Sequence, residues 1–202
     1  EIFKELILRW SAFFSNKKND KLGEKDIMGL WGEIYVVRDL ILSNKIDVNE
    51  ILSSWMGPYD KEKDFKFSYL HLEIKTIKQD SELIEISSEF QLTPENDIPI
   101  ELRVVKVRME DNGLNLSQLV ESTVNLIIQR SGQVDVFYAA IIQKVRIIDL
   151  NEYDNYCFAV NNDHTYTASN LDFPKITSAE LKNGISKVKY KIDLSKIINF
   201  LK

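Results

Sequence analysis

Apolar residues recur at helical spacing in the first 55 residues of the chain. They predict a helix over Ile2 to Phe14 and a second helix over about Glu24 to Ser43. A short third helix, capped by Asn49, is predicted to end near Trp55. The buried stripe of the second helix is predicted to be Ile27, Leu30, Ile34, Val37 and Ile41.

Beyond Gly57 the hydrophobic period changes from near 3.6 to 2, which indicates a sheet. Asp64 to Phe67 and Leu70 to Ile77 are predicted to form an antiparallel hairpin around a tight turn at Ser68-Tyr69. Further strands are predicted over Leu83 to Ser87 and Ile98 to Met109.

Helical spacing returns over Leu116 to Arg130, where Asn115 and Gln118 are placed as a capping box. Val134 to Gln143 is compatible with a helix or a buried strand, and we favour the helix. Short strands are then predicted over Tyr156 to Val160, Tyr166 to Ala168 and Lys187 to Ile192. Helices followed by strands and another helix predict a layered domain, and the pattern leaves the α/β and α+β classes open.

The 202 residues suit one domain spanning 1–202, with an N-terminal helix and loop over 1–23, a core over 24–130 and a C-terminal part over 131–202. Because the chain begins at Glu1 rather than Met, we expect a fragment of a longer protein. A hydrophobic share of 44% and a charged share of 28% exclude a disordered or fibrous class.

Charge and apolar runs narrow the range of partners. A net charge of -5 argues against a general nucleic-acid coat protein, which usually carries a basic surplus. The lysine-rich segment from Lys182 to Lys202 is more often a solvated face than a DNA contact. No apolar run reaches the roughly 20 residues of a membrane span, so no membrane partner is expected. The single cysteine, Cys157, excludes an internal disulfide and favours the cytoplasm.

Two acids and a lysine are predicted to meet on the hairpin. Alternation along its second strand places Glu73 and Lys75 on one face, about 7 Å apart. On the first strand Phe65 and Phe67 face the core, so Asp64 faces the other way and can approach Glu73.

Carboxylates this close repel unless a cation or a shared proton lies between them, and oxygen ligands select hard ions such as Mg²⁺ or Mn²⁺. Asp64 and Glu73 are therefore candidate metal ligands. A metal held there can polarise a phosphoryl oxygen and help to ionise an attacking water, which phosphodiester hydrolysis needs. Lys75 can orient that water or stabilise charge that develops on the phosphate.

Glu33 supplies a third acid at the margin of the buried stripe of the second helix. A buried carboxylate has to be paired, metal-bound or protonated, and the sequence leaves these alternatives open. Gly29 and Gly32 flank it, and we expect close packing against another element to explain glycine within a helix. His71 and His164 lack a second histidine or cysteine at ligand spacing, which predicts surface residues.

A longer string of residues resembles a known family, the bacterial PD-(D/E)XK-like proteins that are often encoded beside restriction and phage-defence genes. The similar segments are Gly29-Leu-Trp-Gly-Glu33, Trp55-Met-Gly-Pro58, Asp64-Phe-Lys-Phe67, Glu73-Ile-Lys-Thr76, Ile86-Ser-Ser88 with Gln91-Leu92, Phe173-Pro174 and Gly184 to Tyr190. The resemblance covers most of the chain, from about residue 27 to 193. Glu-x-Lys alone is what a solvent-exposed sheet ordinarily shows, so the specificity lies in the string.

The resemblance implies a restriction-endonuclease-like core, in which a mixed sheet is flanked by helices. Matched by position, Asp64 and Glu73 would hold Mg²⁺ and Lys75 would be the motif lysine. Glu33 would be the helix acid that many such nucleases have, and Gln91 a polar residue near the site. The chain departs from the motif at one position, because Lys63 stands where proline precedes the aspartate.

Residues and resemblance together predict a Mg²⁺-dependent DNA endonuclease of restriction or phage defence, in which Mn²⁺ can substitute. DNA is the expected substrate, other subunits of a defence system are expected partners, and a homodimer is compatible with the sequence. An inactive nucleic-acid-binding or assembly subunit is the alternative, which the acidic balance favours. RNA and branched DNA stay open as substrates, because their metal-assisted hydrolysis uses the same ligands.

Overall fold

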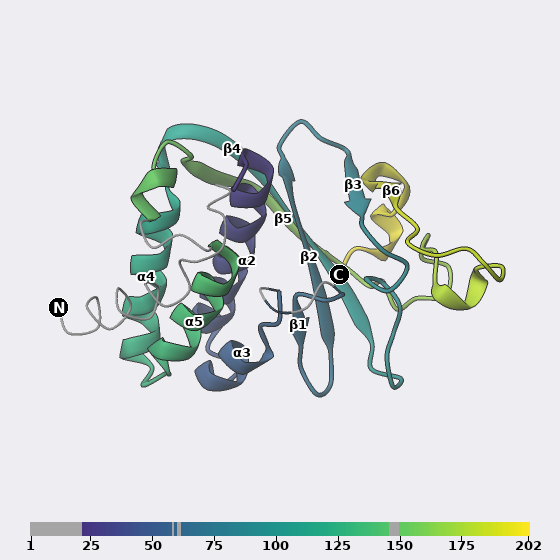
Figure 1. Ribbon diagram of the computed structural model, residues 1–202, viewed down its shortest axis with the longest axis horizontal. Coiled ribbons are helices and arrows are strands. Elements are labelled where there is room, and N and C mark those ends of the chain that lie inside the picture. Colours follow the sequence, from purple (N-terminus) through teal and green to yellow (C-terminus); the bar gives the residue numbers. More distant parts are fainter. Residues whose placement is uncertain (1–21, 58, 60–61, 146–149) are drawn as a thin grey trace. The chain divides into compact units, whose positions relative to one another are not determined.

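The computed structural model describes residues 22–57, 59, 62–145 and 150–202, and the predicted helix over Ile2 to Phe14 lies outside these ranges. The described residues contain four α-helices and a mixed sheet, which confirms the predicted α/β fold class (Figure 1). They divide into two compact units. Unit 1 consists of the described residues within Glu1–Ser53 and Glu110–Phe158. Unit 2 consists of those within Ser54–Met109 and Ala159–Lys202.

Unit 1 is helical. It contains α2 (Glu24–Ser43), α4 (Leu116–Gln129), α5 (Val134–Val145) and all but the last residue of α3 (Val48–Ser54). Helix α2 packs against α4, and α4 against α5 (Figure 1). The five residues of the predicted stripe on α2 are all buried: Ile27, Leu30, Ile34, Val37 and Ile41. The helical prediction for Val134 to Gln143 is confirmed as well.

The two helix caps that the sequence predicts have different outcomes. The capping box of α4 is confirmed, because Asn115 Oδ1 accepts from the Gln118 main-chain N–H at 2.8 Å. The predicted Asn49 cap of α3 is wrong. Asp47 Oδ1 accepts from the main-chain N–H of Asn49 at 2.8 Å, and Asn49 Oδ1 instead accepts from Gln133 N at 2.9 Å. Both residue types cap helices well, so the residue types alone do not choose between them.

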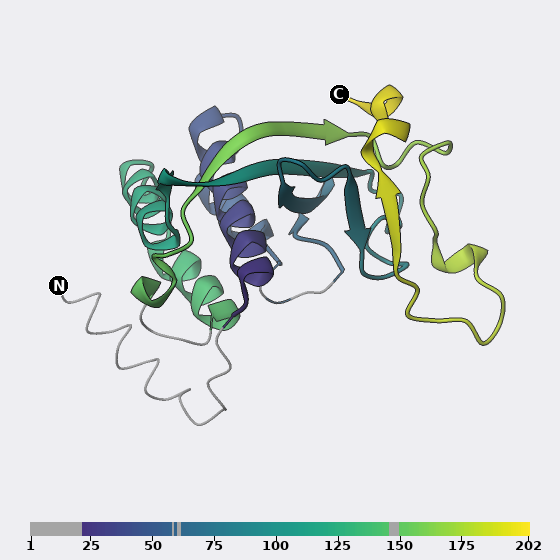
Figure 2. The ribbon, with the colours of Figure 1, turned by 90° about the horizontal axis from the view of Figure 1, so that it is seen from above.

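Unit 2 contains most of the sheet structure. The four-stranded sheet has the order β1 (Phe65–Lys66), β2 (His71–Lys78), β4 (Ile100–Leu114) and β5 (Phe158–Tyr166). Strand β2 pairs antiparallel with β1 and parallel with β4. Strands β4 and β5 run side by side (Figure 2). Strands β3 (Leu83–Ile86) and β6 (Tyr190–Asp193) form a second, antiparallel pair. Short 3₁₀ turns complete the chain at Leu150–Tyr153, Ser178–Glu180, Leu194–Lys196 and Ile198–Phe200.

The predicted hairpin is present. The register pairs Phe65 with Leu72, and Phe67 N donates to Leu70 O at 3.0 Å across the turn. Both phenylalanines are buried as expected. The predicted separate strand at Tyr166 to Ala168 is wrong, because Tyr166 is the last residue of β5.

Strand β2 is central, which changes the environment of its polar face. It lies between β1 and β4, and His71, Leu72, Glu73 and Ile74 are all buried. The predicted surface position of His71 is therefore wrong, since its residue is only 4% exposed. The hydrophobic cluster of unit 2 brings together residues of β3, β4 and β6, among them Ile84, Ile86, Leu102, Val104 and Ile192.

Two glycines meet different surroundings in unit 1. A Cβ added at Gly113 of β4 would lie 2.7 Å from the main-chain carbonyl of Phe158, too close for any side chain. A Cβ added at Gly29 of α2 meets no described atom within 4 Å. The close packing expected at Gly29 is therefore not found among the described residues.

We expect Gly113→Ala to destabilise the protein by about 1–3 kcal/mol, because the contact with the Phe158 main chain forces a backbone shift. Gly29→Ala serves as the control and should raise stability by about 0.5–1 kcal/mol, the usual gain of alanine over glycine within a helix. Urea denaturation of both variants measures the two shifts. Equal effects of the same sign would contradict the assigned surroundings.

Candidate metal-binding site

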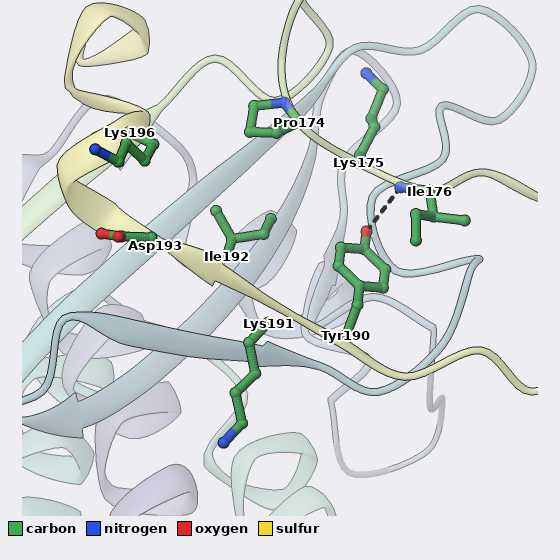
Figure 3. Close-up of a pocket in the computed structure, with 8 residues that line it drawn as sticks. All are labelled: Pro174, Lys175, Ile176, Tyr190, Lys191, Ile192, Asp193 and Lys196. Carbon is green, nitrogen blue, oxygen red and sulfur yellow. Dashed lines mark hydrogen bonds between the residues drawn. The ribbon is translucent and has the colours of Figure 1, made fainter.

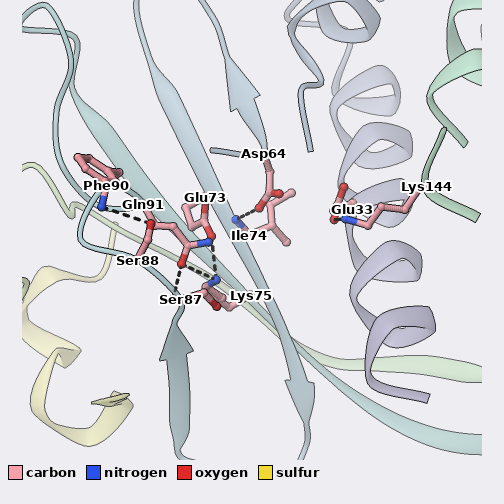
Figure 4. A network of polar contacts seen from close by, with 10 residues as sticks. All are labelled: Glu33, Asp64, Glu73, Ile74, Lys75, Ser87, Ser88, Phe90, Gln91 and Lys144. Carbon is pink, nitrogen blue, oxygen red and sulfur yellow. Dashed lines mark hydrogen bonds and ion pairs between the residues drawn. The ribbon is translucent and has the colours of Figure 1, made fainter. Parts of the chain in front are cut away.

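Unit 2 carries four of the five residues that the sequence singles out. Asp64 directly precedes β1, Glu73 and Lys75 lie on β2, and Gln91 lies in the segment that follows β3. Figure 4 shows the side chains of Glu73, Lys75 and Gln91 together on β2 and its neighbouring loop, with Asp64 beside the same strand.

Asp64 is attached to β2 through its side chain. Its Oδ2 accepts from the main-chain N–H of Ile74 at 2.7 Å. Strand β1 begins only at Phe65, so the carboxylate takes the place that a further strand residue would occupy. The main-chain oxygen of Asp64 accepts from Met56 N at 2.8 Å and Gly57 N at 3.0 Å. The next step of the β1–β2 register sets Asp64 opposite Glu73.

Glu73 and Lys75 form a buried ion pair. Lys75 Nζ lies 2.8 Å from Glu73 Oε1, and the two side chains are 15% and 2% exposed. Removing a carboxylate from water is costly unless a cation or hydrogen bonds compensate its charge. Lys75 supplies that compensation from the same face of β2, as the alternation of the strand predicts.

Gln91 holds the other side of the lysine. Its Oε1 accepts from Lys75 Nζ at 3.2 Å and from the main-chain N–H of Ser87 at 2.7 Å. Ser87 is the first residue after β3, so Gln91 connects the end of β3 to the lysine on β2. The Lys75 ammonium is therefore fixed between a carboxylate and an amide oxygen (Figure 4).

Glu33 belongs to unit 1. It is buried on α2, and its Oε1 accepts from Lys144 Nζ of α5 at 3.2 Å (Figure 4). The sequence left a paired, a metal-bound and a protonated Glu33 open, and the structure contains the ion pair with Lys144. Lys144 was not anticipated, because the sequence does not show that the last turn of α5 faces α2.

The donor set suits a hard divalent cation. Asp64 and Glu73 offer carboxylate oxygens, which Mg²⁺ and Mn²⁺ prefer to nitrogen or sulfur ligands. Across the ranges that the structure describes, no group of three or more histidines, cysteines, aspartates and glutamates could hold a metal. Mg²⁺ usually keeps several waters and uses one or two carboxylates besides phosphate oxygens, so two acids are compatible with it.

A second charged group precedes Asp64, and sequence reasoning missed it. Lys63 is only 1% exposed; it pairs with Glu95 and donates to the main-chain oxygen of Phe90 at 3.1 Å. The hydrogen bond from Lys63 lowers the pKa of Glu95. Burial, aided by the charge of Lys63, lowers the pKa of His71, so this imidazole is neutral at pH 7. The sequence signal that could have revealed this buried lysine is its position, because lysine stands at residue 63 where the motif has proline.

A separate pocket of about 420 Å³ lies in unit 2 (Figure 3). Tyr190 and Ile192 form part of its wall, and Tyr190 Oη accepts from Ile176 N at 3.2 Å. The ammonium groups of its lysines, Lys175, Lys191 and Lys196, point away from one another (Figure 3). They do not focus charge on one point, and none of the four candidate residues of unit 2 lines this pocket. The lysines from Lys182 to Lys202 are exposed, which a solvated face and a DNA contact would both show.

The mixed sheet, with an aspartate before one strand and Glu-x-Lys on the next, defines a protein of the PD-(D/E)XK class. A family model described as "Putative PD-(D/E)XK family member, (DUF4420)" matches residues 1–195, and the chain belongs to this family. No curated protein and no solved structure gave a match. Among the described helices, none combines the length and apolar character that crossing a bilayer requires.

Gln91→Met should destabilise the protein by about 1–3 kcal/mol, because the main-chain N–H of Ser87 loses its acceptor and Lys75 loses a partner. Gln91→Glu keeps an acceptor for both donors and is the matched control. Thermal or urea unfolding compares the two variants. A Gln91→Met variant as stable as the wild type would show that these hydrogen bonds do not hold the segment after β3.

Proposed function

We propose that the protein is a metal-dependent DNA endonuclease that hydrolyses phosphodiester bonds. The observation that carries the proposal is the buried Glu73 carboxylate paired with Lys75, which Gln91 also contacts, on the strand to which Asp64 is hydrogen-bonded, in a chain of the PD-(D/E)XK family. A buried ion pair seldom adds stability over apolar residues of similar size. Its presence in the interior therefore favours a functional role over a purely structural one.

Each residue has a proposed part in the reaction. Asp64 and Glu73 would hold Mg²⁺, with Mn²⁺ as a substitute. When bound, the metal would supply Lewis acidity toward the phosphate and lower the pKa of a water. Lys75 orients the attacking water or stabilises charge on the phosphate, and Gln91 keeps its ammonium in place. Glu33 is proposed as a further acid of the site, paired with Lys144 in the structure.

We further propose a role in restriction or phage defence, in the cytoplasm, for a single nuclease-like domain spanning 1–202. A net charge of -5 leaves little general attraction for DNA, so another subunit of the system, or a second copy of the chain, would help to bind the target. The same acidity supports a second candidate function, an inactive nucleic-acid-binding or assembly subunit of a defence complex.

Plasmid DNA incubated with the protein and Mg²⁺ should be cleaved, and EDTA should abolish cleavage. We expect Asp64→Asn, Glu73→Gln and Lys75→Met each to lower the rate about 10²-fold or more, the usual loss when a group that stabilises developing charge is removed. Glu82→Gln is the control, because Glu82 is an exposed acid of the same unit, paired with Lys106.

Circular dichroism must show each variant folded, since Lys75→Met removes the partner of a buried carboxylate. Cleavage that persists unchanged in Asp64→Asn or Lys75→Met would reject the proposed active site. Absence of cleavage by the wild type, combined with tight DNA binding, would support the inactive binding subunit.

Mn²⁺ binding tests the metal ligands without any need for activity. Titration calorimetry should detect binding to the wild type, and Asp64→Asn or Glu73→Gln should weaken it at least tenfold, which corresponds to about 1.4 kcal/mol. Glu33→Gln in the same titration tests whether the acid of α2 contributes. Unchanged affinity in both Asp64→Asn and Glu73→Gln would exclude these carboxylates as ligands.

A further inference from the structure

Lys63 is a buried cation in contact with two points of one loop. Its side chain is fully buried, whereas the Glu95 side chain with which it pairs is 34% exposed. The Lys63 ammonium also donates to Phe90 O at 3.1 Å. On the outer side of Glu95, Lys66 Nζ lies 3.6 Å from Oε2. Lys63, which immediately precedes Asp64, thereby contacts both ends of the segment from Phe90 to Glu95.

That segment is the one that positions Gln91. Phe90 immediately precedes Gln91, and its main-chain oxygen accepts from Thr93 N at 3.2 Å as well as from Lys63. Thr93 Oγ1 donates back to Glu89 O at 2.7 Å, which closes a compact turn around Gln91. Lys63 is the sequence neighbour of Asp64, and its partner Phe90 is the sequence neighbour of Gln91. The hydrogen bond between Lys63 and Phe90 therefore links the chain next to Asp64 with the chain next to Gln91.

Removing an ammonium group from water costs free energy, which its ion pair and hydrogen bonds have to offset. A methionine of similar length would fill the space without desolvating a charge. What only the cation provides is a directional link to a carboxylate and a carbonyl at the same time. This argues for a positioning function rather than for stability alone.

We propose that the buried Lys63–Glu95 pair, together with the bond to Phe90, is a clasp that aligns the two arms of the candidate site. One arm is Asp64 with its bond to Ile74 N, and the other is Gln91 with its bonds to Ser87 N and Lys75. Lys63 is a positioning residue in this arrangement and touches no reacting atom. The catalytic consequence rests on the proposed function, whereas the alignment itself does not.

Amide hydrogen exchange tests the alignment in the full chain. The N–H groups of Ser87 and Ile74 report on the two arms, because each donates to a side chain of the site. Lys63→Met should accelerate their exchange at least tenfold. The main-chain N–H groups between β2 and β4, such as those around Leu102, should change less than twofold.

Lys106→Met is the matched control, because it breaks another lysine–glutamate pair in unit 2, Lys106 Nζ to Glu82 Oε1 at 2.6 Å, to which no residue of the segment from Phe90 to Glu95 belongs. It should leave Ser87 and Ile74 unchanged. Lys63→Arg, which keeps the charge, should restore at least part of the protection. Equal acceleration at β4 and at both arms, or no acceleration at either arm, would overturn the clasp.

Kinetics give a second measurement once the wild type is shown to cleave DNA. Lys63→Met should then lower kcat at least tenfold while KM for DNA changes less than twofold, because alignment acts on the chemical step rather than on binding. A raised KM with unchanged kcat would overturn the inference. An inactive wild type would reject the proposed endonuclease and leave the exchange measurement to decide the clasp.

Discussion

The structure of the candidate site depends on the burial of a carboxylate in the middle of a sheet. Strand β2 lies between β1 and β4, so the face that carries Glu73 has little access to water. A charged group in that position needs a compensating charge, and Lys75 provides it two residues away on the same face. The lysine in turn needs acceptors, which explains why the segment after β3 brings Gln91 to it.

Two lysines of low side-chain exposure, Lys63 at 0% and Lys75 at 15%, thus form ion pairs in this region. Lys75 reaches Glu73 and Gln91, and Lys63 reaches Glu95 and Phe90. Both act on the segment between β3 and β4, one through the Gln91 side chain and the other through the neighbouring main chain. Such a segment is restrained more than an ordinary surface loop, and this restraint is what a site with fixed donors requires.

Lysine pairing is common to two of the three acids proposed as ligands. Glu33 has Lys144 in unit 1, and Glu73 has Lys75 in unit 2, while Asp64 bonds to the main chain of β2. The lysine charges offset part of the cost of burying these two carboxylates. A cation arriving at Glu73 would share that carboxylate with Lys75, so the metal affinity of this site reflects both charges.

Local patterns were sufficient for most elements. The stripe of α2, the capping box of α4, the hairpin around Ser68-Tyr69 and the shared face of Glu73 and Lys75 follow from local sequence patterns, chiefly helical or strand periodicity. The predicted cap of α3 is wrong, because aspartate and asparagine both cap helices well; Asp47 caps α3, and Asn49 accepts from Gln133, far along the chain.

By itself, the sequence determined which residue types stand together on the hairpin and which family the motif resembles. Only the tertiary structure decided that β2 is central, that His71 and Lys63 are buried, and that Glu33, Lys75 and Lys63 pair with Lys144, Gln91 and Glu95. The physical reason is that burial depends on the neighbours a strand or helix acquires from distant segments. Periodicity specifies the face of a side chain, whereas the packing of the whole unit specifies what covers it.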